Sequence, residues 1–427
     1  MSAQAQVIFT GGLFLLTYAM IIAEKIHRTV VALAGAIIVI LAGVVSQEQA
    51  IESIDFNTIG LLIGMMIIVG ITRHTGVFEY MAVKAARLSK GEPVAIMLYL
   101  SVITAVASAL LDNVTTVLLM VPVTFAIAEK LQVNVLPMLI AEVVASNIGG
   151  TATLIGDPPN IMIGSATGLG FMDFAVNLTP VIVVVLIATL IWLKILYGKQ
   201  LVTRDELKKE LVAMDPDDQI KDRKLLKKCL FVIVMTILGF VLHQYVHLES
   251  ATIALGGASL LLLLTREEPE HALHAVEWPV IFFFAGLFMI VGALEHVGII
   301  EAVAKKSLEI TGGEIVSTGL LILWLSAIAS AFVDNIPFVA TMIPLIQDMG
   351  RLGGISDLNP LWWSLSLGAC LGGNGTLIGA SANVVVAGMA EKRGVLITFI
   401  HFTKIAFPMM IMSIIISTGY LLLFYLK

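Results

Sequence analysis

The sequence predicts an all-α polytopic membrane protein made of two inverted-topology repeats, each with about five spans, one re-entrant helical hairpin and one discontinuous helix. Composition is the first observation behind this prediction: 58% of the residues are hydrophobic and 13% are charged, whereas soluble domains carry about 25% charged residues. The second observation is that two sequence segments each occur twice. The third is an odd number of predicted spans in each half. About 20 apolar residues cross a bilayer as a helix, so the 427 residues allow roughly ten crossings.

The repeated phrases keep a nearly constant spacing. Residues 105–122 read AVASALLDNVTTVLLMVP and residues 327–344 read AIASAFVDNIPFVATMIP, with nine of the 18 positions identical at an offset of 222. Residues 149–160 read GGTATLIGDPPN and residues 372–383 read GGNGTLIGASAN, at an offset of 223. Such polar pairs, set twice in long apolar sequence, predict a buried site with two-fold pseudosymmetry.

The first repeat is predicted to cover residues 1–198. Its apolar runs predict three spans and a closing span, and an amphipathic run predicts an interfacial helix after the third span. In chain order these are 7–23, 29–45, 57–72, the interfacial helix 76–90, and 175–197.

Two interrupted elements lie between the interfacial helix and the closing span. A hairpin at about 94–128 has Asp112-Asn113 at its tip, and non-helical backbone at membrane depth is tolerated only inside protein or beside water. A discontinuous helix at about 136–166 follows, because Gly149-Gly150 and Pro158-Pro159 interrupt its apolar run. These breaks free backbone groups near the middle of the membrane.

A polar linker at 199–228 separates the repeats. It contains nine Lys and Arg residues, so the positive-inside rule places it in the cytoplasm and predicts a multi-pass protein of the inner cell membrane. The second repeat, 229–427, is predicted to follow the same plan. Its elements are spans at 229–246, 251–265 and 278–294, an interfacial helix at 299–312, a hairpin at about 315–349, a broken helix at about 361–390 and a span at 398–425.

Five crossings per repeat make the second repeat run through the membrane upside down. The first hairpin is then expected to open from the cytoplasm and the second from the exterior. This is the inverted-repeat architecture of secondary transporters, in which binding occurs near the midplane at discontinuous helices.

The candidate binding residues lie at the hairpin tips and helix breaks. Freed N–H groups and helix N-termini can face an anion, and loose carbonyl and amide oxygens can coordinate a hard cation. Asn113 and Asn335 are the Na⁺ candidates. A lone Asn or Thr can instead serve only as a helix–helix hydrogen bond. The full candidate set is Asp112, Asn113, Thr115, Thr116, Asn147, Thr151, Thr153, Asp157, Asn160, Asp334, Asn335, Asn374, Thr376, Ser381 and Asn383.

Two acidic residues break the symmetry of the repeats. Asp157 aligns with Ala380, and Glu142 aligns with Leu365. A carboxylate present in one half only is a candidate proton carrier, since intramembrane acids are costly and mark ion pathways. The alternative is a buried acid paired with a neighbour. Cys229 and Cys370 are isolated thiols without metal-ligand spacing and are expected to be inert.

The motifs resemble those of the ArsB/P permease branch of the ion transporter superfamily. The resemblance rests on LLDNVTT, SNIGGTATLIGDPPN, DNIPFVATMIP and LGGNGTLIGASANVV and extends over nearly the whole chain. More distant similarity is to arsenite permeases, NhaD-type sodium/proton antiporters and divalent-anion/sodium symporters. In the dicarboxylate relatives, Ser-Asn-Thr at each tip binds sodium and substrate. Here Asp112-Asn113-Val114 and Asp334-Asn335-Ile336 stand in those places, which weakens the case for a dicarboxylate. The resemblance also implies a homodimer and an elevator-like movement.

Several functions are compatible with these patterns. The first is an ion-coupled secondary active transporter that moves a small anion or oxyanion, arsenite-like or carboxylate-like, by alternating access. The alternative is an Na⁺/H⁺ antiporter of the NhaD type. A channel is disfavoured by the broken helices. An intramembrane aspartyl protease needs Tyr-Asp and Gly-x-Gly-Asp, which Leu111-Asp112 and Val333-Asp334 do not supply, so no enzyme activity is expected. The expected partners are the solute, Na⁺ or H⁺ as coupling ion and the lipid bilayer, with no organic cofactor and no nucleic acid.

Overall fold

The computed structural model describes residues 2–23 and 25–426, and every regular element in these ranges is a helix. The first half contains ten helices. They are α1 (Ala3–Ala23), α2 (Arg28–Leu41), α3 (Gln47–Glu52), α4 (Phe56–Arg73), α5 (Val77–Leu88), α6 (Pro93–Leu110), α7 (Asn113–Leu131), α8 (Leu136–Gly150), α9 (Pro158–Thr167) and α10 (Phe171–Tyr197).

The second half repeats this order of long and short helices. A connecting segment carries α11 (Asp205–Val212) and the 3₁₀ turn η1 (Pro216–Gln219). The second set is α12 (Arg223–Val246), α13 (Ser250–Thr265), α14 (Pro269–Leu273), α15 (Trp278–His296), α16 (Ile299–Thr311), α17 (Ile315–Phe332), α18 (Asn335–Gly353), α19 (Asn359–Gly372), α20 (Ser381–Glu391) and α21 (Phe399–Phe424). The short helices α3 and α14 are additions to the predicted elements, and they too occupy matching places.

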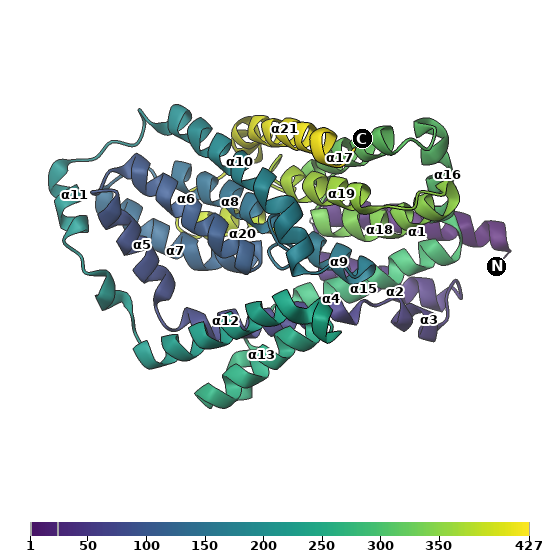
Figure 1. The fold of residues 1–427 in the computed structure, drawn as a ribbon, viewed down its shortest axis with the longest axis horizontal. Coiled ribbons are helices and arrows are strands. Elements are labelled where there is room, and N and C mark those ends of the chain that lie inside the picture. Colours follow the sequence, from purple (N-terminus) through teal and green to yellow (C-terminus); the bar gives the residue numbers. More distant parts are fainter. Residues whose placement is uncertain (1, 24, 427) are drawn as a thin grey trace.

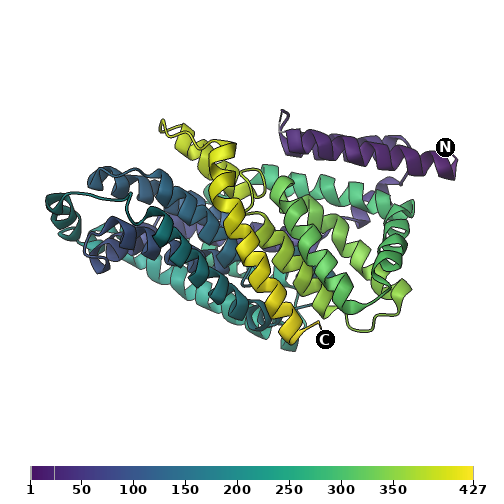
Figure 2. The ribbon, with the colours of Figure 1, turned by 90° about the horizontal axis from the view of Figure 1, so that it is seen from above.

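The protein is an all-helical membrane protein with inverted repeats. In the described chain, nine helices are long and apolar enough to cross a membrane, and α2, α8 and α13 are shorter apolar helices. The hairpin α6–α7 lies toward the end of the molecule that carries α5 and α11, and the hairpin α17–α18 lies toward the opposite end, with α3 and α16 (Figure 1). Seen from above, α1 runs along one side of the molecule, and α21 runs obliquely across the other helices (Figure 2).

Each hairpin turns within two residues because its tip leaves the helical conformation. Leu111 is extended, with φ −130° and ψ 164°, and Asp112 then caps α7 by accepting the N–H of Thr115 at 2.8 Å. In the second hairpin, Val333 is extended and Asp334 caps α18 by accepting the N–H of Ile336 at 3.1 Å. Aspartate is a strong N-cap because its side chain satisfies a free backbone donor. The predicted hairpins and their tips therefore form as expected.

The predicted breaks fall between α8 and α9 and between α19 and α20. Pro158 and Pro159 open α9, where a missing N–H is tolerated. The first arm of each hairpin packs on the broken helix of its own half, as α6 with α8 and α17 with α19. The second arm packs on the broken helices of both halves, as α7 with α8 and α20 and α18 with α19 and α9. The two halves are thus interlocked at the tips and breaks.

The linker is folded against the first half. The N–H of Lys221 donates to the Thr75 carbonyl at 2.9 Å, and Lys208 Nζ lies 2.9 Å from Glu92 Oε1. α12 starts at Arg223, inside the stretch predicted as linker, because Asp222 caps it and accepts the N–H of Leu225 at 2.9 Å. That backbone hydrogen bond is the main reason that the pKa of the exposed Asp222 carboxyl lies below its usual range.

Candidate functional site

The amide side chains predicted for the site form one hydrogen-bonded chain across both halves. Asn113, the first residue of α7, donates its Nδ2 to Oδ1 of Asn147 on α8 at 3.1 Å. Asn147 donates in turn to Oδ1 of Asn374 and to Oδ1 of Asn383, both at 2.9 Å. All four side chains are buried. The two repeated phrases therefore meet at one place, as the sequence predicted.

A second set of predicted residues holds the breaks in shape. Asn160 Nδ2 donates to the Thr153 carbonyl at 2.9 Å, and Asn383 Nδ2 donates to the Thr376 carbonyl at 2.8 Å. The hydroxyls of Thr153 and Thr376 donate to carbonyls in the last turn of α6 and α17, respectively. These hydrogen bonds occur at equivalent positions in the two halves. Thr153 and Thr376 therefore tie each unwound segment to its own hairpin.

We expect Thr153→Val to lower the free energy of unfolding by about 1–2 kcal/mol, because the Ala109 carbonyl loses a donor without a change in side-chain shape. Thermal unfolding of the purified protein would measure it. Thr189→Val is the matched control, since within the described residues the buried Thr189 hydroxyl has no hydrogen-bond partner to lose. Equal melting temperatures for the two variants would contradict the assigned role of Thr153.

The first tip is satisfied by its own residues. Asp112 accepts the N–H of Thr115 at 2.8 Å and also its hydroxyl proton. Thr151 donates its hydroxyl to the Asn147 carbonyl at 2.7 Å. The Thr116 hydroxyl is buried and has no partner in the described chain. Across residues 2–23 and 25–426, no Lys, Arg or His forms an ion pair with Asp112.

The second tip faces the asymmetric acid of the first half. Asn335 Nδ2 lies 3.3 and 3.4 Å from the two carboxylate oxygens of Asp157, which stands at the N-cap position of α9. The corresponding N-cap position of α20 is Ala380. The predicted asymmetry therefore lies inside the site, beside one tip only.

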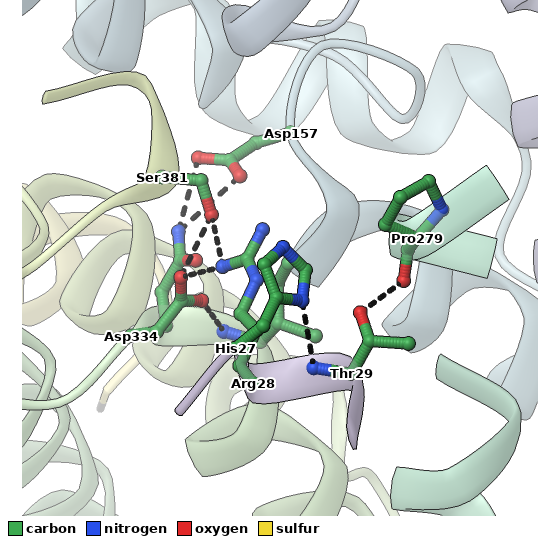
Figure 3. Close-up of polar contacts among 9 residues, drawn as sticks. His27, Arg28, Thr29, Asp157, Pro279, Asp334 and Ser381 are labelled. Atoms are coloured by element: carbon green, nitrogen blue, oxygen red, sulfur yellow. Dashed lines mark hydrogen bonds and ion pairs between the residues drawn. The ribbon is translucent and has the colours of Figure 1, made fainter. Parts of the chain in front are cut away.

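Arg28 is the residue that the sequence analysis missed. It is the first residue of α2, and its Nη1 lies 2.6 Å from Asp334 Oδ2 and 2.6 Å from Ser381 Oγ. Ser381 also donates to Asp334 Oδ2 at 2.7 Å. Figure 3 shows the guanidinium directed at the second hairpin tip. The three side chains come from α2, from the tip and from the second break.

No signal in the sequence pointed to this role of Arg28, because the apolar run predicted a longer span at 29–45. A basic residue at the start of a span ordinarily indicates only membrane sidedness. However, α2 has 14 residues and is about 21 Å long at 1.5 Å per residue, which is less than the hydrocarbon thickness of about 30 Å. One end of so short a span must lie at membrane depth, and Arg28 opens it. A basic residue at that position needs a buried partner.

A cavity of about 310 Å³ adjoins this cluster. Arg28, Asp334 and Ser381 line it together with His27 and Glu277, and Val114 contributes from the first hairpin tip. The cavity therefore has one permanent cation, two carboxylates and residues of both tips. It is large enough for a small solute.

Glu142, the other proton-carrier candidate, stands apart from these clusters. Thr124 on α7 donates to its Oε1 at 2.5 Å, and within the described residues its buried Oε2 has no partner. Glu142 lies on α8, as Asn147 does, but it takes no part in the hydrogen bonds of Asn147. Cys370 is a free, buried thiol, and its Sγ lies 3.6 Å from Asn160 Oδ1. The two cysteines form no disulfide.

An all-helical membrane protein whose inverted hairpins and broken helices bring their polar residues together is a transporter by fold and site. This chain belongs to the citrate transporter family: a family model described as "Citrate transporter" matches residues 18–368. The predicted membership of the ion transporter superfamily is thereby confirmed.

Similar proteins are found in bacteria and mammals. The chain is 45% identical over 418 residues to an uncharacterized transporter of Mycobacterium bovis, covering 97% of both chains. It is 37% identical to the P protein of Homo sapiens over 504 residues, which is 99% of this chain and 60% of the P protein. The crystal structure of the YdaH transporter of Alcanivorax borkumensis has the same fold, with a TM-score of 0.58 at 13% identity and 97% coverage of both chains.

Proposed function

We propose that this protein is an ion-coupled secondary active transporter that moves a small anion or oxyanion, carboxylate-like or arsenite-like, by alternating access. The observation that carries the proposal is the cavity beside the second hairpin tip, where Arg28 lies next to the N-termini of α18 and α20. A guanidinium and two helix N-termini favour negative charge. An elevator-like movement within a homodimer is part of the same proposal, by analogy with the relatives.

A carboxylate is the solute class that fits the site best. Arginine presents parallel N–H donors that match a carboxylate in two-point contact. The description of the family as citrate transporters points to the same class. Asp334 would repel such a solute, so a proton or Na⁺ must neutralise charge at the tip when the solute is bound. The amide nitrogens of Asn113 and Asn335 turn toward Asn147 and Asp157, which leaves their oxygens for a cation.

The alternative is a sodium/proton antiporter. The observation that favours it is the buried Asp157 carboxylate beside Asn335, a pair that could exchange a proton for Na⁺ without any organic solute. In that scheme Glu142 on α8 would be a second proton carrier. No organic cofactor is needed in either scheme.

We expect the two functions to separate in proteoliposomes that contain a pH-sensitive dye. A sodium gradient is imposed first without solute, and then with succinate, arsenite or chloride one at a time. The anion transporter is supported if one of these solutes is taken up in an ion-driven way and if the dye reports no pH change when the solute is left out. Sodium-dependent proton movement without solute, lost in Asp112→Asn, would replace the anion proposal with the antiporter.

Asp112→Asn should reduce transport to below about one tenth of the wild-type rate under either scheme, because the tip loses its buried charge. The fold should persist, since asparagine is also a good N-cap for α7. The melting temperature and the initial transport rate, each compared with those of the wild type, measure these two effects. A rate equal to that of the wild type would remove the first tip from the site.

A further inference from the structure

We propose that Arg28 is the anion-binding residue and that Asp334 is its resident counter-ion, so that the solute and Asp334 compete for one guanidinium. Anion binding then requires the coupling ion to neutralise Asp334. This inference rests on the proposed anion transport and specifies how the coupling works.

The contacts of Arg28 leave room for a second partner. Its contacts with Asp334 and Ser381 both run through Nη1, at 2.6 Å each. A guanidinium has five N–H donors, so its other donors let a solute reach Arg28 before the bond to Asp334 breaks. The Arg28 side chain is 25% exposed whereas that of Asp334 is 10% exposed, so the arginine is open to the cavity. Arg28 Cζ lies 4.9 Å from the centroid of the Phe283 ring, and this cation–π contact holds the guanidinium over the ring.

The charges around the pair explain why the solute needs a companion ion. Among the described residues that line the cavity, Arg28 is the one permanently charged cation and His27 is the other basic residue. Among the described residues, the acids near it include Asp334 itself, Glu277 on the cavity wall, and Asp157, which reaches the tip through Asn335. A further titratable group is the Tyr18 hydroxyl of α1, which donates to the carbonyl of Pro337 in the hairpin.

Moving Arg28 from Asp334 to a solute would leave a mostly buried carboxylate without its cation. Such an unpaired charge is strongly unfavourable, whereas a neutral or cation-bound carboxyl group is not. Each bound anion therefore favours uptake of a proton or Na⁺ at Asp334. By linkage, the coupling ion strengthens anion binding by the same factor.

The pseudosymmetry shows that this arrangement is confined to one tip. The first residue of α13, which corresponds to Arg28 of α2, is Ser250. Asp112, the counterpart of Asp334, is held by Thr115 instead of by an arginine. The anion would therefore bind at the second tip. Within the described chain, the donors to the carboxylate of the first tip are the neutral N–H and hydroxyl groups of Thr115.

The pair also joins parts of the fold that must separate in alternating access. α2 packs on α1 and α15, whereas Asp334 belongs to the tip of the α17–α18 hairpin. Releasing Asp334 from Arg28 removes an ion pair between them. Anion binding would thus unlock the hairpin in the same step that recruits the coupling ion.

Binding measurements with succinate at pH 6.5 and pH 8.5, with and without Na⁺, would test the proposal on the purified full-length protein. Wild-type affinity should rise at least about tenfold at the lower pH or with Na⁺. Asp334→Asn should bind tightly under all conditions and lose this dependence, and Asp334→Ser is a second variant in case the first is unstable. Arg28→Gln should not bind.

Lys25→Gln is the matched control, because it removes an equal charge three residues away on an exposed side chain that does not line the cavity. It should behave like the wild type. Succinate's own titration is the same for every variant, so only differences between variants count. If Asp334→Asn keeps the wild-type dependence, or loses binding as Arg28→Gln does, the counter-ion role is wrong while anion transport stands. If wild-type protein neither binds nor transports succinate, arsenite or chloride, both proposals fall.

Discussion

Asn335→Ala is expected to reduce transport to below about one hundredth of the wild-type rate. Asn335 Nδ2 contacts both oxygens of Asp157 at 3.3 and 3.4 Å, and the Asp157 side chain is almost fully buried. Loss of the partner of a buried charged group costs about 3 kcal/mol or more, which corresponds to a factor of over 100. The same substitution removes an oxygen that we propose as a ligand for Na⁺.

The helix α18 should still form after this change. Asn335 is the first residue of α18, and the cap of that helix is the side chain of Asp334, which is retained. The experiment compares initial uptake in proteoliposomes per amount of reconstituted protein, with Asn359→Ala as control, because Asn359 is an exposed residue at the start of α19. Wild-type transport by Asn335→Ala would remove the basis for placing the site at the second tip.

The fold was predictable because its determinants are local or repeated. Apolar length specifies a span, an aspartate between two apolar arms specifies a tip, and Pro158-Pro159 specifies a break. The 222-residue and 223-residue offsets then assign each element of one half its counterpart in the other. Short elements, such as α3 and α14, were not predicted, since polar segments outside the spans carry weak periodicity. Exact bounds also differ, as at the start of α12 at Arg223 and the end of α2 at Leu41.

The roles of individual polar residues were less predictable. Sequence placed Thr153 and Asn147 in one candidate set, but the first bonds its own hairpin whereas the second bridges the two halves. That distinction depends on how the two halves pack, which periodicity does not encode. Arg28 was missed for the same reason: its partner Asp334 is 306 positions away in the chain.

Gly149→Ala should destabilise the protein by about 3 kcal/mol, at the upper end of the range for overpacked cores. A Cβ at this position would lie 2.0 Å from the Ala105 carbonyl oxygen and 2.5 Å from its Cα, so the conflict is with the backbone of α6 and no rotamer change relieves it. Gly372 meets Ala327 on α17 in the same way, with its Cβ 2.6 Å from the carbonyl oxygen. Its replacement by alanine should cost less because that approach is looser.

These two glycines set the distance between each hairpin and its broken helix, and that distance brings the tips to the breaks. Loss of stability should therefore be accompanied by loss of transport in whatever protein remains folded. Gly256→Ala in α13 is the control, since nothing lies within 4 Å of the added methyl group; it should be neutral or slightly stabilising because alanine favours the helix. Thermal unfolding and folded yield of the three variants measure the effect. Melting of Gly149→Ala at the temperature of Gly256→Ala would mean that α6 and α8 lie further apart than the structure places them, and the close contact between tip and break would have to be abandoned with it.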